Sequence, residues 1–250
     1  MLQTMGLVKQ FKKFRAVDGL DLEVKAGQIV GLIGPNGAGK TTTLRCMCGI
    51  LRPTNGQVLI NGYDLLKDAS HAKQGLAFVP EVPALYDLLT VDEHLRFVAM
   101  CYSKLDVYER IGDQLLGEYN LSDKKMDLVA TLSKGMRQKL AVACALIHEA
   151  NVFLFDEPMI GIDPSGVHQF KQEMLQLREK GASIIVSTHL LDTAQKLCDR
   201  VVIMSKGKII ASGTLEELRT MEGMQDKSLE DVFLALTESP AQTPLPPVIS

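Results

Sequence analysis

Residues 34–41 form a glycine-rich segment that follows the pattern Gly, four residues, Gly-Lys-Thr. Glycines allow consecutive backbone N–H groups to curl around a polyphosphate without clashing Cβ atoms. Lys40 can then supply a cation for the β- and γ-phosphates, and the hydroxyl of Thr41 is a ligand for Mg²⁺. The pattern therefore predicts a nucleoside-triphosphate site.

Two adjacent acids, Asp156 and Glu157, follow the apolar residues 152–155. A nucleotide site of this kind needs a carboxylate at the end of a buried strand to hold Mg²⁺, and we expect Asp156 to be that group. Glu157 would then face the γ-phosphate and polarise the attacking water as a general base. The two acids could also simply begin a loop.

The elements around these residues must bring them together. Residues 29–33 are an apolar run that predicts a buried strand leading straight into the glycine-rich segment. Residues 41–48 predict a helix whose positive dipole end points at the phosphates. Apolar runs at 152–155 and 184–186 predict two more buried strands, and residues 201–211 predict a hairpin. This alternation favours an α/β core.

A helical part is expected within this core. Residues 90–147 change to helical periodicity, and Thr90 can cap the first helix while Glu93 reaches back to it. The sequence after residue 237 is rich in proline, which is typical of disorder. We therefore expect one domain over residues 1–237, with a helical subdomain at about 88–147, and a disordered tail over 238–250.

Composition limits the classes of protein. A net charge of -3 supplies no general field for nucleic acid, so no nucleic-acid partner is expected. The longest apolar run, residues 140–147, is far below the roughly 18 residues that span a bilayer. The first residues do not resemble a secretory signal, which favours a cytoplasmic location. The five cysteines lack the paired spacing of a zinc site, so we interpret them as reduced packing residues.

Three further motifs make the chain resemble the nucleotide-binding subunit of an ATP-binding cassette (ABC) transporter over roughly residues 7–237. Residues 132–138 look like the family's signature sequence, residues 161–164 like its D-loop, and residues 187–189 like its switch histidine. Each motif alone has a simpler interpretation, such as a capping turn or a locally satisfied histidine. The resemblance implies a P-loop NTPase (RecA-like) core with an antiparallel β subdomain and an inserted α-helical subdomain.

The resemblance also implies the cofactors, ATP and Mg²⁺, and the residues that hold them. Catalytic roles fall on Glu157, His189 and Lys40. The implied ATP contacts are Phe11, Val17, Asn36, Gly37, Ala38, Gly39, Lys40, Thr41, Thr42, Ser133 and Gly135, and the implied Mg²⁺ ligands are Thr41, Glu81 and Asp156. Phe11 would stack on adenine, while Ser133 and Gly135 would come from a second subunit, so that two chains sandwich the nucleotide.

Three residues depart from the family pattern. Glu81 stands where the family usually has glutamine, and in the signature Lys134 and Met136 stand where glycine and glutamine are more usual. Glutamate can still ligate Mg²⁺ and adds a negative charge near the phosphates, which predicts a stronger Mg²⁺ dependence. Lys134 could add charge against the facing nucleotide or could be a solvated side chain beside a helix cap.

Residues 80–91 and 228–237 resemble stand-alone ATPase subunits of bacterial exporters. The resemblance implies a homodimer or related heterodimer, peripheral on the inner face of the membrane, that drives a separate polytopic permease. Leu85 and Tyr86 would line an apolar groove for a cytoplasmic helix of that permease, unless they pack internally. The alternatives are a soluble cassette ATPase that acts on ribosomes or DNA, and a small-molecule kinase with the same phosphate loop.

Overall fold

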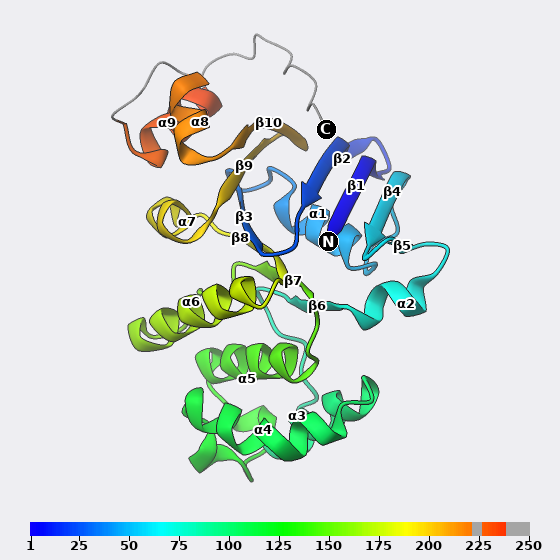
Figure 1. The fold of residues 1–250 in the computed structure, drawn as a ribbon, viewed down its shortest axis with the longest axis vertical. Helices are drawn as coiled ribbons and strands as arrows, with labels where there is room; N and C mark the ends of the chain where they lie inside the picture. The colour runs from blue at the N-terminus through cyan, green and yellow to red at the C-terminus, as the bar shows by residue number, and fades with distance from the viewer. Residues whose placement is uncertain (222–226, 239–250) are drawn as a thin grey trace.

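Two β-sheets organise the structure, a computed structural model that describes residues 1–221 and 227–238 (Figure 1). Four strands form an antiparallel sheet in the order β2-β1-β4-β5: β1 (Leu2–Phe11), β2 (Phe14–Val24), β4 (Asn55–Ile60) and β5 (Tyr63–Asp64). Six strands form the second sheet in the order β10-β9-β3-β8-β7-β6: β3 (Gln28–Ile33), β6 (Leu76–Val79), β7 (Val152–Asp156), β8 (Ser183–Ser187), β9 (Arg200–Ser205) and β10 (Lys208–Gly213).

The second sheet is parallel from β9 to β6, and only β10 runs antiparallel at its edge. Because the strands are parallel, the carboxyl ends of β3, β6, β7 and β8 meet at one edge of the sheet. Those ends lead into the glycine-rich segment, Glu81, Asp156 and His189. The strands at 29–33, 152–155 and 184–186 and the hairpin at 201–211 are confirmed.

Helices surround the sheets and also form a separate lobe. The helices are α1 (Lys40–Met47), α2 (Ala69–Gln74), α3 (Val91–Cys101), α4 (Leu105–Glu118), α5 (Lys134–Ile147), α6 (Pro164–Glu179), α7 (Leu191–Leu197), α8 (Leu215–Met221) and α9 (Leu229–Glu238), with 3-10 turns at Ser122–Lys124 and Val129–Thr131. In the part of the chain that is described, no helix has both the length and the apolar character to cross a membrane.

The helical lobe, α3 to α5, is inserted between β6 and β7, which are neighbours in the sheet (Figure 1). The predicted cap at its start is present: the backbone N–H of Glu93 donates to Thr90 Oγ1, and the N–H of Thr90 donates to Glu93 Oε2. One apolar cluster runs from Phe155 in β7 through Leu140 in α5 to Leu95 in α3. The lobe therefore shares a continuous core with the sheet, while its limits as a subdomain stay a prediction.

The helices α7, α8 and α9 lie beside β9 and β10 (Figure 1), and they share an apolar cluster with one face of these strands. The expected disordered tail begins at residue 238, which is the last residue of α9, and residues 239–250 lie outside the described residues.

Candidate functional site

The glycine-rich segment joins the central strand β3 to helix α1. Thr43 is the first residue whose N–H finds an acceptor in the helix, the carbonyl of Gly39. The N–H groups of Lys40, Thr41 and Thr42 therefore face outward at the positive end of the helix, ready for an anion. Gly39 has φ 106, and a Cβ there would lie 2.3 Å from the carbonyl oxygen of Ala16, so no other residue fits. The N–H of Ala38 is used internally, because it donates to the carbonyl of Pro35.

Lys40 lies almost fully buried at the start of α1. Its Nζ donates to the carbonyl of Gly34 at 2.7 Å. Burial lowers the pKa of Lys40, and the nearby carboxylates of Glu157, Asp156 and Glu81 oppose that shift. The ammonium group is thus held over the loop with three acids around it.

Asp156, at the end of β7, is buried beside the loop. Its Oδ1 accepts from Thr41 Oγ1 at 3.2 Å and from Ser187 Oγ at 2.7 Å. Its Oδ2 is buried with no hydrogen-bond donor among the described residues. A buried carboxylate oxygen without a donor, beside a threonine hydroxyl, fits the oxygen-ligand preference of Mg²⁺.

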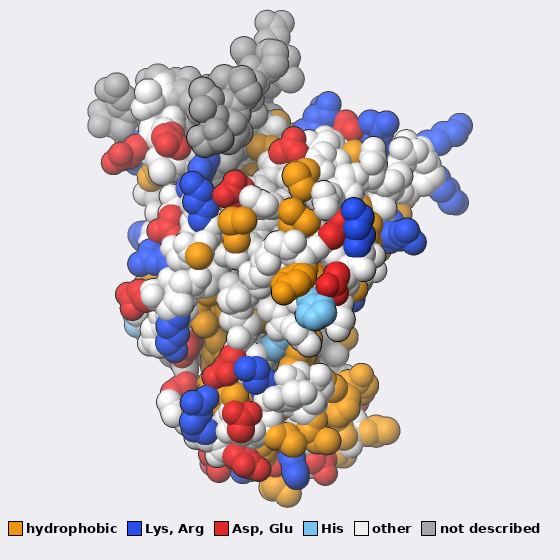
Figure 2. Space-filling model, turned by 45° about the vertical axis from the view of Figure 1, so that its right-hand side comes forward, with side chains coloured by type: hydrophobic (Ala, Val, Ile, Leu, Met, Phe, Trp, Pro, Cys, Tyr) orange, Lys and Arg blue, Asp and Glu red, His pale blue; other side chains and the backbone are white. Residues whose placement is uncertain are grey.

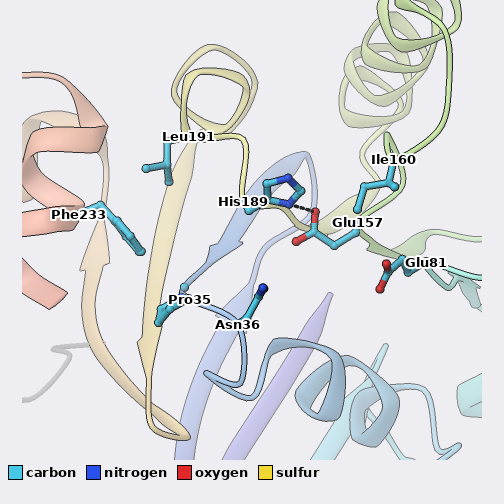
Figure 3. Close-up of a pocket in the computed structure, with 9 residues that line it drawn as sticks. Pro35, Asn36, Glu81, Glu157, Ile160, His189, Leu191 and Phe233 are labelled. Carbon is cyan, nitrogen blue, oxygen red and sulfur yellow. Dashed lines mark hydrogen bonds and ion pairs between the residues drawn. The ribbon is translucent and has the colours of Figure 1, made fainter.

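Glu157 has φ 47, in the left-handed region that non-glycine residues seldom occupy. Its backbone N–H donates to Ser187 Oγ at 2.9 Å and to the Ser187 carbonyl at 3.2 Å, and these bonds hold the turn. The Nδ1–H of His189 donates to Glu157 Oε2 at 2.9 Å (Figure 3), since an ionised carboxylate can only accept. Through Ser187, strand β8 thus holds the carboxylate of Asp156 and the backbone turn at Glu157, and it presents His189 to the Glu157 carboxylate.

A cavity of about 420 Å³ opens beside these residues (Figure 3). Within the described ranges it is lined by two carboxylates, one histidine, the phosphate loop and an apolar side: Gly34, Pro35, Asn36, Glu81, Glu157, Ile160, His189, Leu191 and Phe233. Glu81 reaches it from the segment between β6 and the helical lobe. Most of the predicted phosphate, metal and catalytic residues therefore lie together at one edge of the sheet.

Two predicted nucleotide contacts, Phe11 and Val17, are not among the described residues that line the cavity, and they differ from each other. Phe11 ends β1 with its ring partly exposed, and the ammonium of Lys9 lies 5.0 Å from the ring centroid. Val17 is fully buried in the apolar cluster between the two sheets. Its side chain has no accessible surface in this conformation, and its contact with the nucleotide stays a prediction.

Ser133 and Gly135 do not line the cavity among the residues that the structure describes. Ser133 caps α5, where its Oγ accepts from the N–H of Met136, and it is exposed. A Cβ on Gly135 would lie 2.6 Å from the carbonyl of Gly161, so glycine allows the two segments to approach. The two residues thus form a separate exposed helix start.

Sequence reasoning gave no functional role to Ser187, Leu191 or Phe233. Ser187 ends a buried strand next to β7, so the rule that parallel strands share one functional edge could have indicated it. Phe233 had no such signal, because it reaches the cavity from a helix near the carboxyl terminus.

The chain is similar to known proteins along almost all of its length. A family model described as "ABC transporter" matches residues 17–160. The ABC-type transporter ATP-binding protein EcsA of Bacillus subtilis (strain 168) is 36% identical over 242 residues, which cover 96% of this chain and 98% of EcsA. The probable multidrug ABC transporter ATP-binding protein YbhF of Escherichia coli (strain K12) is 36% identical over 240 residues, 94% of this chain and 41% of YbhF.

A solved structure of the ATP-binding subunit of an ABC transporter matches with a TM-score of 0.91 and 37% identity, over 95% of this chain and 99% of that one. The likeness extends through both sheets and the helical lobe, which confirms the predicted fold class. The chain therefore belongs to the ABC transporter family and is one of its ATP-binding subunits with ATPase activity.

Proposed function

We propose that this chain hydrolyses ATP within a dimer and that the cycle of closing and opening drives a separate membrane permease. The observation that carries the proposal is the contact between Glu157 and His189 at the edge of the phosphate loop, because it joins a base to an orienting group beside the γ-phosphate position. The soluble ATPase alternative is not favoured, since the relatives reported above are named as transporter proteins.

The triphosphate is bound by the outward N–H groups of the loop and of the first turn of α1, and Lys40 contacts its β- and γ-phosphates. Phe11 stacks on the adenine. Thr41, Asp156 and Glu81 are the groups that would hold Mg²⁺, which when bound neutralises developing phosphate charge. The orphaned Oδ2 of Asp156 supports this assignment.

Glu157 accepts a proton from the attacking water. The hydrogen bond from His189 Nδ1–H fixes one oxygen of the Glu157 carboxylate, which leaves the other oxygen to face the water. The same bond leaves Nε2 as the other ring nitrogen, and in the imidazolium form, where both ring nitrogens are donors, Nε2 can donate to the γ-phosphate. Hydrolysis thus depends on positioning more than on covalent chemistry.

Closure requires a second copy of the chain or a related subunit. The start of α5, with Ser133 and Gly135, presents unsatisfied N–H groups that suit a γ-phosphate, yet it lies outside the chain's own cavity. Head-to-tail pairing brings this helix start to the partner's nucleotide. ATP then stabilises the closed dimer, and loss of the γ-phosphate releases it.

The permease docks on the outer face of the helical lobe. Figure 2 shows hydrophobic side chains gathered over the lower part of the molecule, where Figure 1 has the lobe. Tyr86 is 58% exposed and Phe97 is 39% exposed, and their rings pack edge to face at 5.2 Å. Leu85 instead packs against the lobe's core, so Tyr86 and Phe97 form the exposed apolar surface here. An apolar surface of this kind suits an amphipathic helix at the cytoplasmic face of the membrane.

Replacing both aromatics, Tyr86→Ser with Phe97→Ser, should reduce binding to membranes that contain the permease about tenfold, because exposed aromatic anchors dominate such interfaces. ATP affinity in solution should stay unchanged. Co-sedimentation with native membranes measures the first quantity and nucleotide titration the second. Tyr63→Ser, at a ring that is 45% exposed on β5, is the matched control. If the double variant binds to the membranes as well as the wild type does, Tyr86 and Phe97 are not the docking surface, and the permease must bind elsewhere on the chain.

Replacing Glu81 by glutamine should weaken the dependence of ATP binding on Mg²⁺. Without Mg²⁺, the Glu81 carboxylate repels the triphosphate across the shared cavity, so Glu81→Gln should tighten ATP binding in EDTA about threefold to tenfold. With saturating Mg²⁺ the two proteins should bind ATP within about twofold of each other. Glu216→Gln, an equal charge change on α8, is the control. Equal Mg²⁺ dependence in both variants and wild type would make Glu81 a hinge residue only.

A further inference from the structure

The cavity has an apolar wall that comes from the carboxyl-terminal part of the chain. Phe233 of α9 and Leu191 of α7 line it on the side opposite Glu81 and Ile160 (Figure 3). Phe233 is partly buried and packs against the same apolar cluster as Leu191. Helix α9 therefore contributes directly to the chamber in which Glu157 and His189 meet.

Helix α7, which begins two residues after His189, cannot hold its own position. It has 7 residues, and its N-cap is Leu190, whose side chain makes no capping bond. Isolated helices of this length are unstable in water, and leucine is a poor N-cap. The place of α7 must therefore be set by its neighbours.

Helix α9 is one of those neighbours, and it is fastened to α7 by a hydrogen bond and by packing. The backbone N–H of Leu229 donates to Gln195 Oε1 at 2.9 Å. Leu229 and Val232 are fully buried in a cluster with Ala194 of α7. Any shift of α9 is therefore transmitted to α7 by direct packing of buried side chains.

His189 lies between two anchors. On one side Thr188 is tied to β3, because its N–H donates to the carbonyl of Leu32. On the other side Leu190 begins α7 and accepts the N–H groups of Thr193 and Ala194. The imidazole itself is about half exposed, and its hydrogen-bond partner is the Glu157 carboxylate. The ring position thus depends on the backbone, and the backbone depends on α7.

We infer that α9 holds the switch histidine in its catalytic position and that Phe233 is a positioning residue for hydrolysis. The inference rests on the proposed role of His189. Phe233 closes the apolar wall behind Leu191, so that α7 and His189 keep one arrangement beside Glu157. Its loss should slow the chemical step and leave ATP affinity intact, since the phenyl ring of Phe233 lines the cavity but has neither a hydrogen-bond donor nor a charge for the triphosphate.

The test is a double-mutant cycle with Phe233→Ala and His189→Ala. Phe233→Ala should lower kcat about tenfold, with the Kd for ATP within twofold of wild type and a cooperative thermal unfolding transition retained. The double variant should be as slow as His189→Ala alone, because both changes remove one contribution. Phe233→Leu, which keeps an apolar side chain, should restore most of the rate. Leu234→Ala, at an exposed position of the same helix, is the control and should behave as wild type.

Each outcome decides the matter. If the fold-losses in kcat of the two single variants multiply in the double variant, Phe233 acts independently of His189 and the inference is wrong. A wild-type kcat for Phe233→Ala would also overturn it. If His189→Ala keeps the wild-type rate, the proposed role of the histidine fails, whatever Phe233→Ala does. If Phe233→Ala does not fold, Gln195→Ala takes its place in the cycle, because it removes the bond between α7 and α9 and leaves the core intact.

Discussion

Glu157→Gln is expected to lower the rate of ATP hydrolysis by about 10²–10³-fold, the usual loss when a general base is removed. Glutamine keeps the size of the side chain and can still bond to His189, but it cannot accept a proton from water. ATP affinity should change by less than about threefold, since the loop and Lys40 carry the binding. The measurement is phosphate release at saturating Mg²⁺ and ATP.

The same variant should accumulate as an ATP-bound dimer, because closure is no longer followed by hydrolysis. Size-exclusion chromatography with light scattering would show the change in mass. Glu179→Gln, at an exposed position near the end of α6, is the control. It should hydrolyse ATP at the wild-type rate and should not accumulate as an ATP-bound dimer. A hydrolysis rate within tenfold of wild type would show that Glu157 is not the general base. An ATP-bound variant that stays monomeric would contradict the proposal that two chains enclose the nucleotide.

Ser133→Asp should abolish the closed dimer while sparing ATP binding to the single chain. Aspartate caps a helix as well as serine does, so α5 should remain folded. In the dimer, however, the new carboxylate faces the partner's γ-phosphate, and such like-charge contacts cost several kcal/mol, which is about 100-fold or more in affinity. Hydrolysis should fall with dimerisation.

Ser133→Asn is the matched variant, because asparagine also caps the helix and has nearly the same shape without the charge. It should retain clearly more ATP-dependent dimer than Ser133→Asp under the same conditions. If both variants dimerise alike, the start of α5 does not meet the nucleotide. If Ser133→Asp weakens ATP binding by the isolated monomer, Ser133 belongs to the chain's own site.

The local parts of the site follow from short stretches of sequence. The run 29–33, the glycines after it and Lys40 are contiguous, so strand, loop and helix are predicted together. The cap at Thr90 is equally local, since its partner Glu93 is three residues away. Strand β1 is hard to predict from sequence, because its register to β2 shifts between Thr4 and Leu7 and again between Leu7 and Lys9, which interrupts the alternation of apolar and polar residues.

Other features depend on contacts between distant segments. The bond between Glu157 and His189 joins residues 32 positions apart, and only the pairing of β7 with β8 brings them together. Val17 has an apolar type that suits either an adenine contact or a core, and its burial is decided by how the two sheets face each other. Phe233 reaches the cavity through the packing of α9 on α7, which no periodicity in the sequence encodes.

The insertion of the helical lobe between β6 and β7 has a consequence for the evolution of the protein. Since these two strands are neighbours in the sheet, the chain leaves the core and returns to it at adjacent points. A lineage can therefore remodel the lobe's outer face to suit a new permease without altering the strand order that aligns Asp156, Glu157 and His189. Natural selection can therefore act on the choice of permease and on the chemical step almost independently. Only the side chains of the apolar cluster that joins the lobe to the sheet must change together.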